Sequence, residues 1–374
     1  MKIEILQEEL NKALATVNRF VDSRPQLPIL TNILFSTKGK KLKLSATNLN
    51  LGINLNLGAK VEKEGQIAIP AREITEFISY LSPGPLSLEL INNQLVVASA
   101  SNKASFVGIK PEEFPSLPQL PSKNTFSLEA KSLSQAVAEV SFAAATDETR
   151  PVLAGIYWEF LAKEYRMVAT DGYRLSLKKV GLKKEVASDK KKVIFLLPAR
   201  SLAEVVRLTD ADFVEVGLTK EENQVVFGLG NAQISSRLLE GEFPEFEKII
   251  PTTSKTRVWV DKTDLHSATK TASVFAKEKA NIVILEISKK EIVIRADAPQ
   301  MGENQSIVAA KVEGEPLKIA FNFKFLLDFI NAAPQEENNL LLEFTQGLSP
   351  ALFKIEGDDT WLQVIMPVRL ENEE

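Results

Sequence analysis

The sequence contains no cysteine, and this absence excludes disulfide bridges, thiol nucleophiles and thiolate metal sites. It contains one histidine, His266, within DKTDLHSATKTA, a segment whose apolar spacing predicts an amphipathic helix. A single helical histidine gives little support to a catalytic triad or a histidine-based zinc site. A Walker-type phosphate loop is missing, and GLGN at 228–231 is only half of a dinucleotide fingerprint. The sequence therefore predicts no catalytic residue, no cofactor and no metal.

Long hydrophobic runs are also missing, since none approaches the roughly 18 apolar residues of a membrane helix. The first ten residues, MKIEILQEEL, carry acids where a secretory signal would be basic and then apolar. We therefore expect an intracellular protein. An excess of positive charge is absent as well, because the formal net charge is -4 at pH 7. This value argues against a protein that grips nucleic acid by bulk charge, although it permits a local basic face.

What the chain does have is internal repetition, with a period of about 125 residues. IAIPAREITEFISYL at 67–81 corresponds to FLLPARSLAEVVRLT at 195–209 and to IAFNFKFLLDFINAA at 319–333. SRPQLPIL at 23–30 corresponds to TRPVLAGI at 149–156, and SATNLN at 45–50 to VATDGY at 168–173. Three copies of one unit fill the chain.

Each copy divides again into two halves. Apolar residues at helical spacing predict six amphipathic helices, which begin about 60–70 residues apart. Alternating patterns predict a hairpin after several helices, with turns at Asn92-Asn93, near Glu221-Glu222 and near Lys289-Lys290. The polar helix faces carry more basic than acidic residues, including Lys12, Arg72, Arg200, Arg207 and Lys324. These cations form a basic side of the molecule or are ordinary solvated helix faces.

In this order and spacing, the motifs resemble the bacterial β sliding clamps, the processivity subunits of DNA polymerase III. The resemblance runs from MKIEI to VIMPVRL at 364–370 and includes IPARE, EEFPSLP, ATDGYRL and GEFPEFEKIIP. It implies an α+β fold with three similar domains, each with two helices packed on antiparallel sheets. The expected domains are 1–121, 122–251 and 252–374. Two chains would close head-to-tail into a ring around duplex DNA, without catalytic activity.

The resemblance also implies functional surfaces. Partners would be double-stranded DNA, the polymerase III catalytic subunit, the clamp loader, repair polymerases and a second copy of the chain, in the cytoplasm and associated with the nucleoid. Partner peptides would dock in a pocket between the central and C-terminal domains. The implied pocket residues are Arg150, Leu153, Thr170, Gly172, Tyr173, Arg174, Leu175, Pro244, Ile249, Val364, Met366 and Val368.

Two further sets of residues are implied. Arg24 would contact DNA together with the helix cations Lys12, Arg72, Arg200, Arg207 and Lys324. Phe106 would meet Val274 and Phe275 of the partner chain, although Phe275 also fits the core of its own helix.

Three alternatives stay open at the level of sequence. Asp171 in ATDGYRL could be a catalytic acid, although the sequence offers it no partner acid, metal or cofactor signature. The fold could also serve a monomeric peptide-binding scaffold that never encircles DNA. The acidic tail, Glu371 to Glu374, either folds back over the pocket mouth and tunes peptide affinity or has no role in binding.

Overall fold

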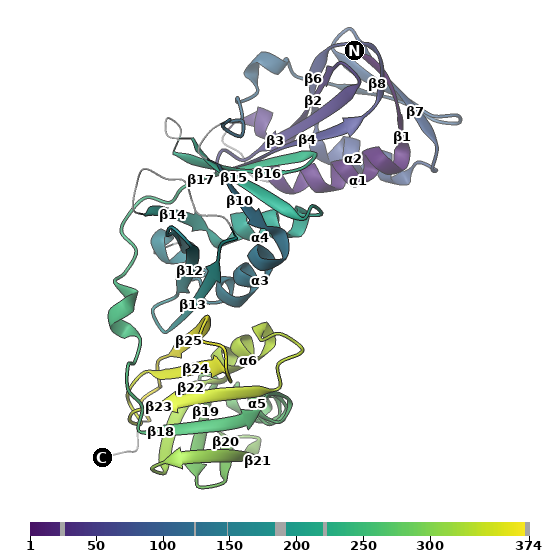
Figure 1. Cartoon of the computed structure of the whole chain (residues 1–374). Coiled ribbons are helices and arrows are strands. Elements are labelled where there is room, and N and C mark those ends of the chain that lie inside the picture. The colour runs from purple at the N-terminus through teal and green to yellow at the C-terminus, as the bar shows by residue number, and fades with distance from the viewer. Residues whose placement is uncertain (23–26, 123–124, 148, 184–191, 220–222, 371–374) are drawn as a thin grey trace. The chain divides into compact units, whose positions relative to one another are not determined.

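The computed structural model describes residues 1–22, 27–122, 125–147, 149–183, 192–219 and 223–370 (Figure 1). Arg24, the turn near Glu221-Glu222 and the acidic tail from Glu371 lie outside the described residues. The chain divides into two compact units. The first comprises Met1–Ala130 and Glu204–Leu238, and the second comprises residues 131–203 and 239–374.

The first unit contains an eight-stranded antiparallel sheet and a five-stranded one. In the larger sheet, β4 pairs with β17, so that strands of the first and second repeats continue one another. The larger sheet runs in the order β10 (Thr125–Glu129), β15 (Phe213–Thr219), β16 (Gln224–Leu229), β17 (Ala232–Arg237), β4 (Leu51–Gly58), β3 (Lys41–Thr47), β2 (Asn32–Lys38) and β6 (Gln66–Pro70). The smaller sheet runs in the order β5 (Lys60–Lys63), β1 (Lys2–Leu6), β7 (Pro85–Ile91), β8 (Gln94–Ala98) and β9 (Lys103–Val107).

The second unit is built on a twelve-stranded sheet. Here β13 pairs with β25, and this pairing joins the second repeat to the third. The strand order is β14 (Val193–Pro198), β11 (Gly155–Phe160), β12 (Glu164–Thr170), β13 (Arg174–Gly181), β25 (Trp361–Ile365), β24 (Ala351–Ile355), β23 (Asn339–Phe344), β18 (Thr256–Asp261), β21 (Gly302–Gly314), β20 (Glu291–Ala298), β19 (Ile282–Ser288) and β22 (Leu317–Asn322).

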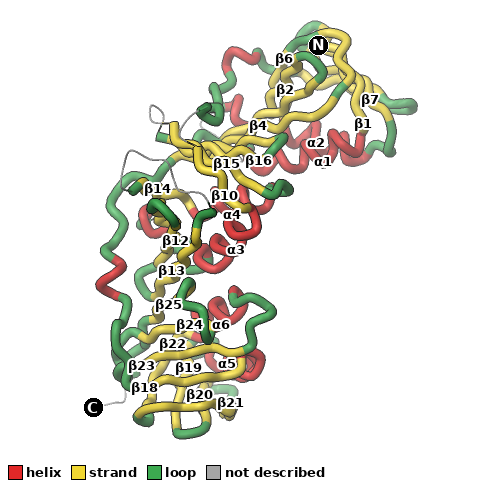
Figure 2. Tube along the Cα trace, in the orientation of Figure 1, coloured by secondary structure: helices red, strands yellow, loops and turns green. Residues whose placement is uncertain are grey.

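Six α-helices occur among the described residues, at the places that the apolar spacing predicts. In the third repeat, α5 and α6 pack beside each other, and α5 lies on β20 and β21 (Figure 2). The Asp261 side chain caps α5 by accepting hydrogen bonds from the amides of Thr263 and Asp264, and Asn322 caps α6 through Lys324 N. The helices are α1 (Gln7–Val17), α2 (Ala71–Tyr80), α3 (Ala130–Ser141), α4 (Ala199–Leu208), α5 (Lys262–Ala276) and α6 (Phe323–Ala332).

Two of the predicted hairpin turns are confirmed. Asn92 and Asn93 connect β7 to β8 with φ values of 45° and 64°, the left-handed conformation that asparagine tolerates in a two-residue turn. Lys289 and Lys290 connect β19 to β20. The hairpins and the helices therefore follow local sequence rules, and the strand pairings β4–β17 and β13–β25 join successive repeats.

Candidate functional site

The segment ATDGYRL forms a turn between β12 and β13 that is held by its own side chains. Asp171 Oδ1 accepts hydrogen bonds from Tyr173 N at 2.9 Å and from Arg174 N at 3.0 Å. Thr170 Oγ1 accepts one from Gly172 N at 3.1 Å and donates one to Arg174 O at 2.6 Å. Gly172 has a φ of 92°, a conformation that favours glycine. Asp171 is therefore a turn residue whose oxygens are occupied by the backbone and by Arg174.

Arg174 connects this turn to the third repeat. Its Nε donates to Asp171 Oδ2 at 3.0 Å, its Nη1 to Asp328 Oδ2 at 2.6 Å, and its Nη2 to the carbonyl of Phe142 at 2.5 Å. The guanidinium also lies over the ring of Phe325, 4.6 Å from its centre. With these partners the side chain is only 10% exposed. Arg174 therefore positions the turn against α6 and offers little surface to a ligand.

An apolar cluster lies beneath the turn. Leu175 and Val364 face each other across the β13–β25 pair and are 2% and 1% exposed. They pack with Phe246, which lies on the short helical segment Phe246–Ile249 of the linker between the second and third repeats. Tyr157 stacks on Phe243 with ring centres 5.3 Å apart. Burial, together with the neighbouring Glu159, raises the pKa of Tyr157 to about 12.

Exposed apolar side chains lie at the edges of this cluster. Tyr173 is 63% exposed, Ile249 is 41% exposed and Met366 is 37% exposed. Met366 N donates to the Tyr173 carbonyl at 2.8 Å, so these two residues are held side by side. Pro244 is also exposed, on the linker that carries Phe243 and Phe246. The turn, the end of β25 and the linker thus present apolar groups above a buried apolar floor.

The segment around Arg150 approaches the other side of the turn. Arg150 Nη2 donates to the Asp171 carbonyl at 3.5 Å, and a Cβ atom on Gly172 would lie 3.4 Å from Arg150 Nη1. Leu153 is half-buried, and its carbonyl accepts a hydrogen bond from Ala145 N at 2.8 Å. The amide of Val368 donates to Ala320 O on β22 at 2.8 Å.

The β13–β25 joint also contains a buried ion pair. Lys178 Nζ lies 2.8 Å from Glu139 Oε2 and 3.5 Å from Asp358 Oδ2. The indole nitrogen of Trp361 donates to the Glu139 carbonyl and to Ser176 Oγ, both at 2.9 Å. Burial raises the pKa of Glu139, although Lys178 and Gln135 oppose this shift through hydrogen bonds. This network ties α3, β13 and β25 together beside the turn.

The predicted DNA-facing cations within the described residues are all exposed. They lie on α1, α2, α4 and α6, and they make no ion pair with another described residue. Arg19 behaves differently, because its Nη2 pairs with Glu204 Oε1 on α4 at 2.6 Å. The exposed and unpaired residues are Lys12, Arg72, Arg200, Arg207 and Lys324.

The predicted interface residues are accessible in the single chain. Val274 on α5 is 51% exposed. Its neighbour Phe275 is half-buried and packs against the core of the third repeat, as its helical position also predicts. Phe106 is half-buried on the edge strand β9, with its ring 5.5 Å from that of Phe77 in an edge-to-face contact.

Some residues of the site could not be named from the sequence. Phe246 lies within the motif GEFPEFEKIIP, and its buried place in the floor follows only from the packing of the linker on β13 and β25. Phe142, Phe325 and Asp328 hold Arg174, and they come from parts of the chain far from it in sequence. Among the described residues, no group of three histidine, aspartate or glutamate side chains is placed to hold a metal ion. No helix in the described ranges is long and apolar enough to cross a membrane.

Comparison with known proteins gives one consistent result. Residues 1–118 match the N-terminal domain of the DNA polymerase III beta subunit, residues 127–245 its central domain, and residues 247–369 its C-terminal domain. The chain is 31% identical to the beta sliding clamp of Staphylococcus aureus over 93% of this chain and 94% of that one.

Solved structures agree. The sliding clamp of Bacillus subtilis superposes with a TM-score of 0.93 at 28% identity, with 99% of each chain covered. A Pseudomonas aeruginosa sliding clamp bound to griselimycin gives a TM-score of 0.92 at 26% identity, with 99% of this chain and 100% of that one covered. The similarity therefore extends over nearly the full length in sequence and in fold.

Proposed function

The chain belongs to the family of DNA polymerase III beta subunits, the bacterial β sliding clamps, and we propose from this membership which of its surfaces carry the function. It is a non-catalytic accessory subunit that confers processivity on the replicative polymerase. The observation that carries this conclusion is the match of three successive domains along one chain. Its fold has three clamp domains, and the working form is a dimeric ring.

The ring holds duplex DNA by enclosing it, so it does not need tight contacts. We propose that the exposed cations on α1, α2, α4 and α6 face the enclosed duplex, with Arg24 beside them. A net charge of -4 combined with cationic helix faces supports this arrangement. Weak attraction to phosphates centres the duplex, while the acidic remainder of the molecule keeps the ring from binding DNA tightly and allows it to slide.

Partner proteins dock at the turn of residues 170–175 in this proposal. Tyr173, Met366, Ile249 and Pro244 present exposed apolar groups above the floor of Leu175, Val364 and Phe246, and such a surface suits aliphatic or aromatic anchors of a short peptide. Arg150, Leu153, Thr170 and Gly172 shape its rim, Arg174 fixes the turn, and Val368 lies at its outer edge. The partners are the polymerase catalytic subunit, the clamp loader and repair polymerases.

The dimer contact that we propose uses Phe106 of one chain against Val274 and Phe275 of the other. The exposure of Val274 and the edge position of β9 support it. We place the protein in the cytoplasm, associated with the nucleoid through the DNA that it encloses. The domain boundaries 1–121, 122–251 and 252–374 stay a prediction.

The test combines the mass of the protein in solution with its retention on circular and on linear DNA. Solution mass should correspond to two chains, which separates the ring from a monomeric peptide-binding scaffold of the same fold. Once the clamp loader has placed the protein on a nicked circular plasmid, it should stay on the circle through gel filtration and leave when the plasmid is cut once. Retention that is equal on circular and linear DNA would show binding by contact and would contradict enclosure.

A further inference from the structure

The turn of residues 170–174 has a counterpart in the first repeat. Thr47 Oγ1 accepts a hydrogen bond from Leu49 N at 3.0 Å and donates one to Leu51 O at 3.1 Å. Asn48 Oδ1 accepts from Asn50 N at 3.1 Å and from Leu51 N at 2.8 Å. These are the bonds that Thr170 and Asp171 make in the second repeat. The first unit therefore contains a second copy of the same turn.

The strand that follows the turn is also paired in the same way. Arg237 N at the end of β17 donates to the Asn50 carbonyl at 2.8 Å, as Met366 N donates to the Tyr173 carbonyl. Gly52 lies opposite Ser235 in the β4–β17 pair, where Leu175 lies opposite Val364 in the β13–β25 pair. The same backbone frame thus carries two small residues in the first repeat and two large apolar residues in the second.

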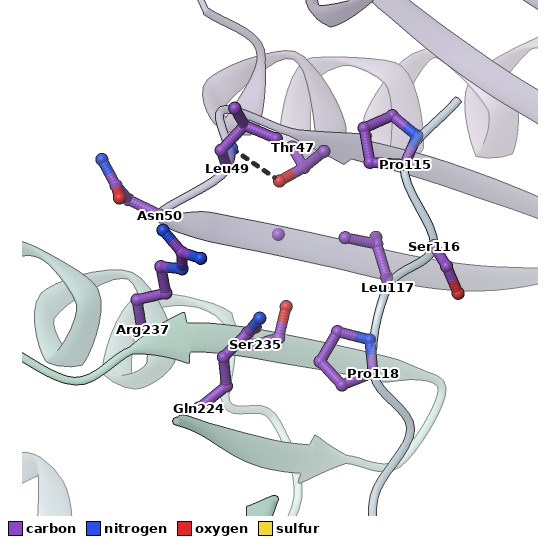
Figure 3. Close-up of a pocket in the computed structure, with 11 residues that line it drawn as sticks. Thr47, Leu49, Asn50, Pro115, Ser116, Leu117, Pro118, Gln224, Ser235 and Arg237 are labelled. Atoms are coloured by element: carbon purple, nitrogen blue, oxygen red, sulfur yellow. Dashed lines mark hydrogen bonds between the residues drawn. The ribbon is translucent and has the colours of Figure 1, made fainter. Parts of the chain in front are cut away.

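Gly52 and Ser235 are among the residues that line a cavity of about 170 Å³. Leu117, from the linker motif EEFPSLP, reaches over Gly52, since a Cβ atom there would lie 2.7 Å from Leu117 Cδ2 and 2.9 Å from Ser235 Oγ. Leu49, Pro115 and Pro118 complete the apolar part of the lining, as Figure 3 shows. Leu49, Leu117, Pro115 and Pro118 therefore give the cavity an apolar wall.

Arg237 is the one charged residue among those that line the cavity. Its guanidinium makes no ion pair or side-chain hydrogen bond with another residue in the described ranges, and the Asn50 amide likewise makes none. Figure 3 shows Arg237 and Asn50 on the side of the cavity opposite Leu117 and Pro118. A guanidinium beside a free amide, facing an apolar wall, suits a ligand with a carboxylate next to an aliphatic group.

We propose that this cavity binds the C-terminal residue of a partner protein when that residue is aliphatic. The cavity is smaller than the roughly 300–1,000 Å³ of drug-sized sites, so it holds about one side chain. A single residue carries both an apolar side chain and a carboxylate only at the end of a chain. The side chain lies in the cavity against Leu49 and Leu117, and the terminal carboxylate lies on Arg237 and Asn50. Capture of a C-terminal carboxylate is an established way of recognising peptides.

This site goes beyond the peptide pocket proposed at Tyr173 and Met366, because it lies in the other compact unit and uses different residues. A negative result at this cavity would therefore leave the proposed peptide pocket unaffected. The probe is N-acetyl-leucine, and the matched control is N-acetyl-leucinamide, which lacks the carboxylate. Both are titrated into the full-length dimer with labelled leucine methyl groups, and the NMR signals are followed.

The methyl signals of Leu49 and Leu117 should shift and saturate at millimolar N-acetyl-leucine, with at least tenfold weaker binding of the amide. Arg237→Gln should weaken binding of the acid about tenfold, whereas Arg237→Lys should retain most of it. Gly52→Ala should also weaken binding, because the added methyl group would lie 2.7 Å from Leu117 Cδ2 and would displace that side chain from its place in the cavity wall. Met366→Ala should leave the titration unchanged.

Several results would overturn the proposal. These are equal binding of acid and amide, an unchanged affinity in Arg237→Gln, or shifts confined to methyl groups around Leu175 and Leu352. An absence of any shift at 50 mM probe, about fifty times a millimolar Kd, would do the same. If Gly52→Ala lowers stability, the exposed pair Arg237→Gln and Arg237→Lys still decides the question, since neither variant alters the core.

Discussion

Asp171 holds a turn, and its contacts explain why an acidic residue is needed there. One oxygen accepts two backbone amides, and the other pairs with Arg174, which in turn reaches Asp328 on α6. A catalytic acid needs a free oxygen directed at a substrate. Here both oxygens are occupied, so the residue orders the backbone of the proposed peptide pocket.

Two substitutions at Asp171 should show how much its backbone hydrogen bonds contribute to stability. Asp171→Asn keeps an acceptor for the two amides and should lower Tm by no more than a few degrees. Asp171→Ala loses both amide bonds and the charge, which costs about 1–3 kcal/mol, so its Tm should fall further. Differential scanning calorimetry measures both. Equal Tm values for the two variants would show that the hydrogen bonds to Asp171 Oδ1 do not stabilise the fold.

Glu139 gives a prediction about pH. Its pKa is raised by burial, so the folded protein retains a proton over a pH range in which the unfolded chain has released it. The contribution of Glu139 to the free energy of unfolding therefore falls as the pH rises from the ordinary glutamate pKa to the raised pKa of the folded protein. Lys178 and Gln135 face Glu139 directly, and Asp358 faces it across Lys178.

Glu139→Gln removes this titration and leaves a side chain of similar shape. The Tm of the variant minus the Tm of the unchanged protein should increase with pH across that range and level off above it. Calorimetry at several pH values measures the difference. A difference that stays flat or falls with pH would contradict the raised pKa. Asp264→Asn, at an exposed position on α5, serves as the control.

At the scale of elements, the helices carry the cations proposed to face DNA. Salt dependence reports how many phosphates a protein neutralises, because each contact releases about 0.9 counterion from B-form DNA. In the double variant Arg72→Gln, Arg207→Gln, the slope of log affinity against log salt on linear duplex should decrease by up to about 2. Fluorescence anisotropy from low to moderate salt measures this slope.

The matched control uses exposed cations on strands. Lys41 on β3 and Lys179 on β13 are both exposed, and neither has an ion-pair partner in the described part of the chain. Changing both to Gln removes the same charge and should leave the slope close to its original value. If the strand variant lowers the slope as much as the helix variant, net charge and not the helix faces governs DNA contact.

At the scale of the whole molecule, ring closure depends on a contact between chains. Changing Val274 and Phe275 to Ala should shift the protein toward monomer at sub-micromolar concentration, because buried aromatic anchors carry much of the energy of an interface. Phe275 also packs in its own core, so Val274→Asp is the cleaner variant at an exposed position. Sedimentation equilibrium measures the mass, and Phe213→Ala, another exposed apolar residue, is the control.

The dimer prediction has a clear contrary result. A Val274→Asp variant that remains dimeric at sub-micromolar concentration would place the interface elsewhere. A loss of helical circular dichroism in that variant would instead assign Val274 to the fold of its own domain, which its exposure argues against.

The sequence by itself determined the threefold repeat, the six helices and the turn at Asn92-Asn93. Helical spacing, alternation and tolerance of positive φ are properties of neighbouring residues, so a linear reading detects them. The family followed from the motifs in their order, and the comparisons confirm it. The resemblance also identified most of the proposed pocket residues. It did not show which of them are exposed and which are buried.

Only the tertiary structure decided what these residues do. It buries Leu175 and Val364 beneath the turn, and it engages Arg174 with Asp328 and Phe142 from distant parts of the chain. It also revealed the cavity lined by Gly52, Leu117 and Arg237, for which the sequence gives no signal. A cavity depends on how the surrounding side chains pack after folding. These side chains come from segments that are far apart in the sequence, so the sequence alone does not show that they are in contact.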